Sequence, residues 1–105
     1  MSEYGAERRR NPRYRCSAPI EIEWGSQNLR LTASDISSSG MFVVTESPLW
    51  MRAEFTARIL GDEPVQVACI VRRVEPGRGM GLEFVPPSAT AQKALDALLW
   101  KLSGK

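Results

Sequence analysis

Between residues 20 and 85 the sequence repeats one simple pattern, in which a short run of alternating apolar and polar residues is followed by residues that favour turns. Alternation with a period of two places the apolar side chains on one face of an extended strand, so each run predicts a half-buried β-strand. The alternating runs lie at residues 20–24, 29–33, 54–59, 65–71 and 81–85, and a short apolar, β-branched run at 41–45 predicts one more strand. Short strands at a spacing of roughly ten residues predict a six-stranded, closed or nearly closed antiparallel barrel.

The breaks between the runs are rich in glycine and proline, which are the residues that turns require. Gly25-Ser26-Gln27-Asn28 separates the first two runs, which we therefore expect to form an antiparallel hairpin. Gly61-Asp62-Glu63-Pro64 and Pro76-Gly77-Arg78-Gly79 separate the later runs. The protein is therefore predicted to be mainly β.

After Pro86-Pro87 the apolar residues change to three- and four-residue spacings, which indicate an amphipathic helix over about residues 88–103 with Ser88 or Thr90 as its cap. The apolar stripe of this helix consists of Ala91, Ala94, Leu95, Leu98, Leu99 and Leu102. Such a stripe has to be buried, either against the barrel or against a partner, and the second case would produce a homodimer.

The charge of the chain is unevenly distributed along its length. The first fifteen residues hold two glutamates and five arginines, which are Arg8, Arg9, Arg10, Arg13 and Arg15, whereas acidic residues slightly outnumber basic ones in the remainder. The 105 residues therefore divide into a flexible arginine-rich arm at 1–15 and a single domain at 16–105. Long nucleic acid needs a broad basic face, so this distribution better suits one small, compact anion.

Several classes of protein are disfavoured by what the sequence lacks. There is no histidine, and Cys16 and Cys69 do not have the spacing of metal ligands, so we expect reduced thiols, no cofactor and no enzyme activity. No run of about eighteen apolar residues is present, and no apolar segment follows the arginines. These observations predict a cytoplasmic protein that is not inserted in a membrane.

The chemistry of the arm is that of arginine alone, because no lysine accompanies the five arginines. The planar guanidinium forms bidentate hydrogen bonds to phosphate or to the O6/N7 edge of guanine, and its flat face stacks on bases. Pro12 disfavours a helix at Asn11, so the arm is expected to be extended or turned. The alternative interpretation is a solvated tail that binds nucleic acid without specificity.

The segment from Asp35 to Gly40 offers a complementary set of groups. Its residues, Asp35-Ile36-Ser37-Ser38-Ser39-Gly40, lie between two predicted strands, where an ordinary turn is one interpretation. In the functional interpretation Asp35 accepts hydrogen bonds from guanine N–H groups, Ser37 donates to a phosphate or base, and Gly40 lets the backbone approach the ligand. Together with the arm, this segment predicts a site for an anionic, guanine-bearing ligand.

These two segments resemble the motifs of the PilZ domain, the bacterial receptor module for cyclic di-GMP (c-di-GMP). The order is Arg9-x-x-x-Arg13 before the first strand and Asp35-x-Ser37-x-x-Gly40 after the second. The glycine-rich run Gly79-Met80-Gly81-Leu82-Glu83-Phe84 and the helix after the barrel extend the resemblance over nearly the whole chain.

The resemblance implies a specific function and a set of site residues. The arm would fold over c-di-GMP through Arg9 and Arg13, and Asp35, Ser37 and Gly40 would contact the ligand from the barrel. An arginine immediately before the first motif arginine, which is Arg8 here, would accompany a stacked ligand dimer. The protein would then be a non-enzymatic receptor whose altered surface signals to a downstream partner protein that the sequence does not identify.

Two other functions remain open at this stage. One is a small β-barrel that binds nucleic acid, and the other is a ligand-independent interaction domain that dimerises through its helix. Arg10, Arg15, Arg72 and Arg73 are not assigned to the ligand; simple alternation would point adjacent Arg72 and Arg73 to opposite faces of their strand. The three tryptophans, Trp24, Trp50 and Trp100, are predicted to pack in the core or at an interface.

Overall fold

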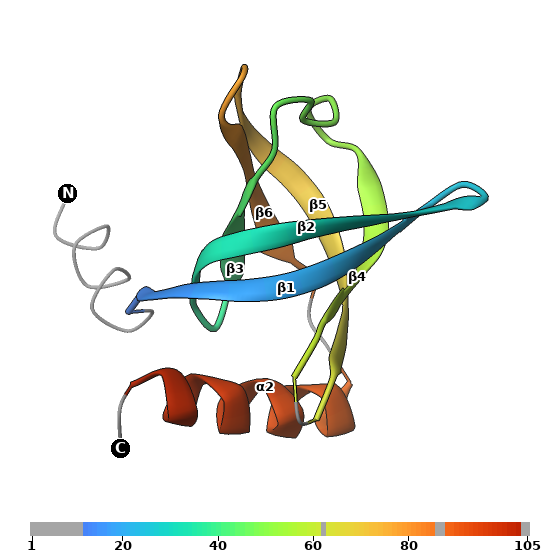
Figure 1. Ribbon diagram of the computed structural model, residues 1–105. Coiled ribbons are helices and arrows are strands. Elements are labelled where there is room, and N and C mark those ends of the chain that lie inside the picture. Colours follow the sequence, from blue (N-terminus) through green and yellow to red (C-terminus); the bar gives the residue numbers. More distant parts are fainter. Residues whose placement is uncertain (1–11, 62, 86–87, 104–105) are drawn as a thin grey trace, which may run out of the picture.

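In the computed structural model, six antiparallel strands form a closed barrel and a single helix follows them (Figure 1). The structure describes residues 12–61, 63–85 and 88–103. The elements are β1 (Tyr14–Trp24), β2 (Gln27–Ile36), β3 (Gly40–Val44), β4 (Glu54–Ile59), β5 (Val65–Glu75), β6 (Gly79–Phe84) and α2 (Ala89–Leu102). The predicted fold class, a mainly β six-stranded antiparallel barrel with a C-terminal helix, is confirmed.

The barrel closes in the order β1-β2-β3-β6-β5-β4, with β4 returning to pair with β1. The predicted hairpin of β1 and β2 is present, and Trp24 pairs with Gln27 at its tip. The long connection between β3 and β4 allows β3 to pair with β6, so β3 lies between β2 and β6 in the wall. This arrangement brings the Asp35 to Gly40 segment beside the last strand.

Strand β1 extends well beyond the alternating run that predicted it. β1 begins at Tyr14, six residues before Ile20, and therefore includes Tyr14 and Arg15 from the predicted arm. Its pairing with β2 shifts register between Arg15 and Ala18, which is the signature of a β-bulge. A bulge interrupts the period of two, so the alternation in the sequence could not reveal this part of the strand.

The core is filled by the inward-facing side chains of all six strands. Fully buried side chains include Ile20 and Ile22 of β1, Ile36 of β2 and Ile59 of β4. Cys69 is also buried, and Cys16 is half-buried against the same core, as expected for small apolar side chains.

Helix α2 lies across one end of the barrel (Figure 1). It contacts β1 and β5, buries Leu95 completely and packs Leu98, Leu99 and Leu102 against the core. Ser88 is the N-cap, and its hydroxyl accepts a hydrogen bond from the Ala91 N–H at 3.2 Å. The apolar stripe therefore packs against the barrel, with Leu95 fully buried and its other leucines partly buried. Among the described residues, no helix has the length and apolar character needed to cross a bilayer.

Of the three tryptophans, Trp24 alone packs against the core. Trp24 packs against the core and contacts the rings of Phe55 and Trp50, with the Trp50 centroid 4.9 Å from its own. The Trp50 side chain is nevertheless 61% exposed, because it lies on the connection between β3 and β4. Trp100 is 63% exposed, so it is not a core residue, and its packing at an interface stays a prediction.

The docking of α2 can be tested by substituting Leu95→Ala. Removing a fully buried leucine side chain leaves a cavity between helix and barrel, and we expect the free energy of unfolding to fall by about 2–5 kcal/mol. Denaturant titration followed by circular dichroism measures the change, with exposed Lys93→Ala in the same helix as the control. Equal stability of the two variants would contradict the observed docking.

Candidate functional site

A row of paired residues crosses the outer surface of the barrel over four adjacent strands. Asp35 of β2 pairs with Phe42 of β3, Phe42 pairs with Gly81 of β6, and Gly81 pairs with Arg73 of β5. Met41 and Val43, on either side of Phe42, both face the core, so Phe42 and its row face outward. The row places an acid, an aromatic ring, a glycine and an arginine side by side.

Two β-bulges determine that the charged ends of this row face outward. Ala33 is fully buried, and regular alternation would also bury Asp35 two residues later, but a register shift between these residues turns Asp35 outward. A second shift lies between buried Val71 and exposed Arg73. The bulges therefore allow both ionised groups to avoid the desolvation cost of the core.

The bulge in β5 also corrects the prediction for its two arginines. Alternation predicted that Arg72 and Arg73 would point to opposite faces, yet both side chains are exposed, at 56% and 62%. An extra residue in the strand breaks the alternation and leaves both guanidinium groups outside the barrel.

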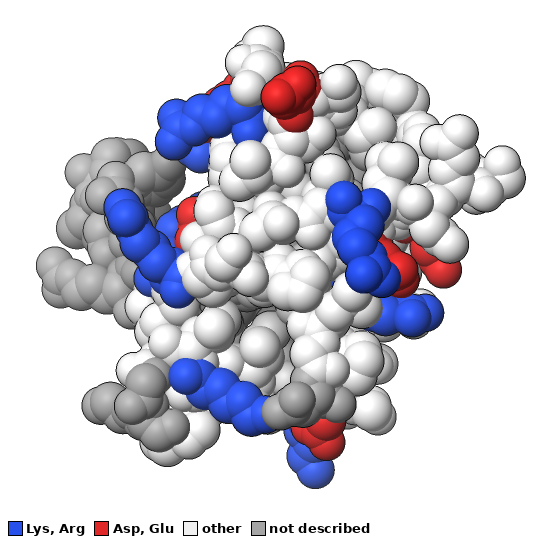
Figure 2. Space-filling model, viewed as in Figure 1, with Lys and Arg blue, Asp and Glu red and all other residues white. Residues whose placement is uncertain are grey.

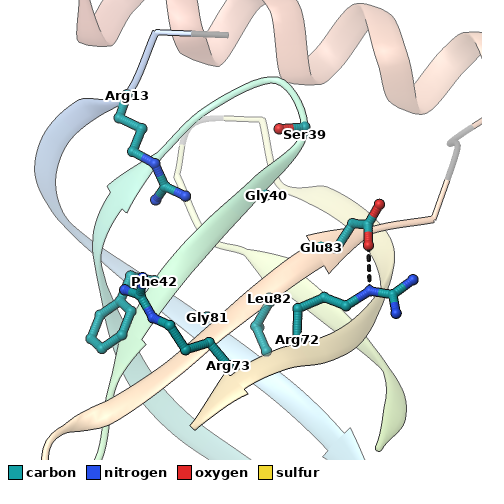
Figure 3. Close-up of a pocket in the computed structure, with 9 residues that line it drawn as sticks. All are labelled: Arg13, Ser39, Gly40, Phe42, Arg72, Arg73, Gly81, Leu82 and Glu83. Atoms are coloured by element: carbon teal, nitrogen blue, oxygen red, sulfur yellow. Dashed lines mark hydrogen bonds and ion pairs between the residues drawn. The ribbon is translucent and has the colours of Figure 1, made fainter. Parts of the chain in front are cut away.

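A surface pocket of about 320 Å³ lies along this row (Figure 3). This volume is within the range of roughly 300–1,000 Å³ that is typical of small-molecule pockets. The lining consists of Arg13, Ser39, Gly40, Phe42, Arg72, Arg73, Gly81, Leu82 and Glu83. The lining holds three arginines, Arg13, Arg72 and Arg73, and one glutamate, so it offers several guanidinium groups to a ligand.

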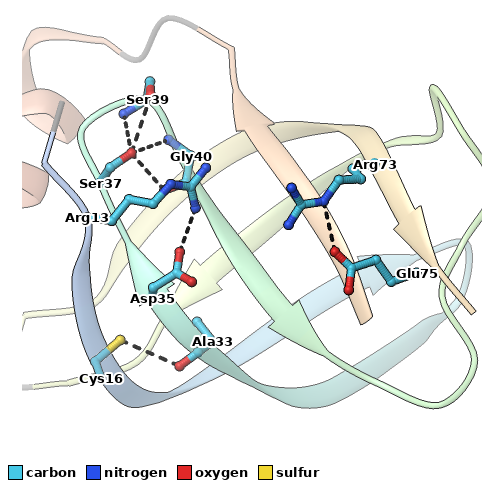
Figure 4. A network of polar contacts seen from close by, with 9 residues as sticks. All are labelled: Arg13, Cys16, Ala33, Asp35, Ser37, Ser39, Gly40, Arg73 and Glu75. Atoms are coloured by element: carbon cyan, nitrogen blue, oxygen red, sulfur yellow. Dashed lines mark hydrogen bonds and ion pairs between the residues drawn. The ribbon is translucent and has the colours of Figure 1, made fainter. Parts of the chain in front are cut away.

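Arg13 and Asp35, which the sequence placed in one site, are in direct contact (Figure 4). Arg13 Nη1 donates a hydrogen bond to Asp35 Oδ1 at 2.7 Å, and the two side chains are 60% and 25% exposed. An ion pair this exposed adds little to stability, but it holds the Arg13 fork beside the pocket. The structure thus brings together the end of the arm and the predicted acidic acceptor.

Ser37 lies below the surface, with 2% of its side chain exposed, and it does not line the pocket. Its hydroxyl accepts hydrogen bonds from the Ser39 and Gly40 N–H groups, both at 3.2 Å, and is 3.3 Å from the Gly40 carbonyl. The Ser37 N–H donates to the same carbonyl at 2.8 Å. Ser37 therefore stabilises the turn between β2 and β3 through hydrogen bonds within the turn. Ser39 and Gly40 of this turn line the pocket.

Gly40 lines the pocket, and its missing side chain also has a role in the packing of the barrel. A Cβ atom built at this position would collide with the backbone carbonyl oxygen of Leu82 in β6. Glycine is thus required for β3 and β6 to approach each other at this end of the barrel. The close approach that the sequence predicted is made, in this structure, to a neighbouring strand.

Part of the predicted site falls on residues that are not described. Arg8, Arg9 and Arg10 lie outside the described residues, whereas Arg15 is an exposed residue of β1 paired with Asp35 across the strands. Of the predicted barrel residues, Gly40 lines the pocket, Asp35 is paired with Arg13 of the lining, and Ser37 is buried beneath the turn that carries Ser39 and Gly40.

Several residues that line the pocket carry no signal for the site in the sequence, and these include Phe42, Arg72, Arg73, Gly81 and Glu83. Phe42 lies in the apolar run at residues 41–45, and the sequence of this run does not show whether the ring faces the core or the outer surface. Arg72 and Arg73 lie far along the chain from Asp35, and only the pairing of β3 with β6 and of β6 with β5 brings them to it.

The two thiols are poorly suited to nucleophilic chemistry. Burial raises the pKa of the Cys69 thiol to about 12, and burial is also the main reason that the pKa of Cys16 is raised. Both therefore stay protonated near neutral pH. Within the described ranges, no cluster of three or more histidine, cysteine or acidic side chains could hold a metal ion.

Comparison with known families identifies one match, to the PilZ domain, over residues 7–100. No curated protein matches the sequence closely enough to count as a relative. Among solved structures, the PilZ domain of YcgR from Escherichia coli, determined with c-di-GMP, is similar with a TM-score of 0.78 and 16% identity, over 91% of this chain and 92% of that domain.

Two further structures share the fold. The inhibitor of motility MotI/DgrA from Bacillus subtilis has a TM-score of 0.76 and 22% identity, with 93% of this chain covering 53% of that one, so the match spans about half of its length. The PilZ domain of CeSA from a cellulose-synthesizing bacterium has a TM-score of 0.70 and 20% identity, over 88% of this chain and 98% of that domain.

The packing role of Gly40 leads to a stability prediction. Gly40→Ala should force β3 and β6 apart and lower the free energy of unfolding by about 1–3 kcal/mol, as overpacking does elsewhere. Gly61→Ala is the matched control, because a Cβ there would meet nothing within 4 Å. Thermal and denaturant unfolding of both variants measure the difference, and a Gly40→Ala protein as stable as the control would refute the close contact.

Proposed function

The chain belongs to the PilZ domain family, and from this membership we propose that it is a non-enzymatic receptor for c-di-GMP. The observation that supports this most strongly is the pocket lined by Arg13, Arg72 and Arg73, which lies along the outward row from Asp35 to Arg73. A cationic lining with an acidic acceptor at its edge suits a ligand that carries both phosphates and guanine bases.

In this proposal Arg13 and Asp35 exchange their mutual ion pair for contacts with the ligand. The Arg13 fork turns to phosphate oxygens, while the Asp35 carboxylate accepts hydrogen bonds from the N–H groups of a guanine. Ser37 holds the turn that positions this edge, and Gly40 lets the ligand and β6 lie close to the β3 backbone. Because the ion pair is exposed, breaking it costs little.

The arm proposed at residues 1–15 provides the remaining contacts. Arg9 closes over the bound ligand, and Arg8 accompanies a second, stacked ligand molecule. Ordering this segment costs conformational entropy, so the charge-assisted hydrogen bonds must exceed that cost. The closed arm changes the molecular surface, and a downstream partner protein reads the change in the cytoplasm.

Two other observations favour this function over the alternatives. On the face shown in Figure 2, the basic side chains form separate groups around an uncharged centre and no continuous basic stripe appears there, which does not favour a track for nucleic acid. In the apolar stripe of α2, Leu95 is fully buried and Leu98, Leu99 and Leu102 are partly buried against the barrel, so the stripe already packs within the chain.

Isothermal titration calorimetry with c-di-GMP tests the proposal. The unsubstituted protein should bind with a small, defined stoichiometry, and Arg9→Ala, Arg13→Ala and Asp35→Asn should each weaken binding about ten- to hundredfold, the effect of losing a charge-assisted hydrogen bond. Arg30→Ala is the control, because Arg30 is an exposed arginine paired with Glu21 and is not part of the pocket lining.

The variants should keep the circular dichroism spectrum of the unsubstituted protein, because the Arg13–Asp35 pair is exposed. Absence of c-di-GMP binding by the folded, unsubstituted protein at physiological salt would refute the proposed function. Binding to single-stranded oligonucleotides that grows with strand length and falls steeply with salt would support the nucleic-acid alternative instead.

A further inference from the structure

The Arg73 side chain takes a path that depends on a glycine in the neighbouring strand. It starts on β5 and crosses β6 at Gly81, where a Cβ atom would lie 3.3 Å from Arg73 Cβ and 3.8 Å from Arg73 Nε. Beyond the glycine the guanidinium reaches the ring of Phe42 on β3, and Arg73 Cζ is 5.5 Å from the ring centroid (Figure 3). The absent side chain of Gly81 therefore makes room for this crossing.

Two contacts hold the Arg73 guanidinium in place. Its flat group lies over the Phe42 ring, a favourable cation–π arrangement, and Nε forms an ion pair with Glu75 Oε2 at 3.0 Å (Figure 4). The side chain is still 62% exposed and lines the pocket. An aromatic ring thus supports one side of the guanidinium, while a large part of the group faces solvent and the pocket.

Arg78 has the same two contacts but is not part of the pocket lining. Arg78 Cζ is 5.8 Å from the Phe42 centroid, and Nη1 is 3.0 Å from the other carboxylate oxygen of Glu75. Its side chain is 76% exposed. The two arginines thus contact the same ring and the same carboxylate. They differ in that Arg73 lines the pocket and Arg78 does not.

We infer that Arg73 is a base-stacking residue, on which one guanine of the ligand lies, so that the Phe42 ring, the guanidinium and the base form three layers. This inference rests on the proposed function and adds a residue outside the arginine and Asp-Ser-Gly motifs. A guanidinium already held by Phe42 and Glu75 loses little rotamer entropy when a base stacks on it, and stacking is a large contribution to the binding of single bases. Lysine would retain the charge at this position but lacks the flat surface.

Calorimetry with c-di-GMP on the full chain tests this role. Arg73→Ala should weaken binding about ten- to hundredfold, in line with the loss of one stacked base, and Arg73→Lys should weaken it nearly as much. Arg78→Ala removes the equivalent contacts with Phe42 and Glu75 and should bind like the unsubstituted protein. Gly81→Val, which fills the path of the Arg73 side chain, should also weaken binding.

The outcomes separate this inference from the proposed function. If the unsubstituted protein binds c-di-GMP and Arg73→Ala binds equally well, Arg73 has no such role and the receptor function stands. If Arg73→Lys retains full affinity, the contribution is charge and stacking is refuted. If the unsubstituted protein does not bind, both fail. Circular dichroism verifies that each variant is folded. If Arg73→Ala does not fold, the affinity of Arg73→Lys, which keeps the aliphatic stem and the charge, decides whether Arg73 stacks on a base.

Discussion

The register shifts in β2 and β5 are the constraint on which the pocket depends. In both strands a run of inward-facing residues ends at a fully buried apolar side chain, Ala33 or Val71, and a charged residue follows two positions later. Unbroken alternation would direct Asp35 and Arg73 into the core, where an ionised group costs several kcal/mol. The extra residue in each strand reverses the alternation locally, and both charges then reach the outer surface.

Once these charges face outward, the pairing of β3 with β6 brings them to one site. Phe42 and Gly81 lie between Asp35 and Arg73 in the same row, so the acid and the arginine belong to one surface although they are far apart in the sequence. The arginines that line the pocket each pair with a carboxylate: Arg13 with Asp35, Arg72 with Glu83 and Arg73 with Glu75. These exposed pairs position the guanidinium groups while leaving them able to exchange partners.

The sequence predicted the parts of this arrangement that depend on regular periodicity and short motifs. The six strands and the helix follow from alternation and helical spacing, and the resemblance to the PilZ motifs placed Arg13 and Asp35, which are in contact, at one predicted site. The bulges could not be predicted in this way, because a bulge is a local departure from the period of two on which the prediction relies. For this reason the outward direction of Arg73 and the extension of β1 to Tyr14 were missed.

The structure also changes the explanation for two of the motif residues. Ser37 and Gly40 were predicted from the chemistry of ligand contact, yet one closes a turn and the other lets two strands meet. Both roles require the same residue types as ligand binding would. The turn needs a hydroxyl at Ser37, and the contact between the strands needs a residue without a side chain at Gly40. Sequence alone cannot separate these explanations, since the neighbours of each residue come from distant strands.

A titration of ¹⁵N-labelled protein with c-di-GMP, followed by amide chemical shifts, tests the central claim most directly. The account predicts that the largest changes fall on the outward row, at Asp35, Phe42, Gly81 and Arg73, and on the turn at Ser39 and Gly40, with small changes at the β1–β2 tip near Gly25. Saturable changes confined to the β1–β2 tip or to the exposed face of α2, with the row unaffected, would contradict it.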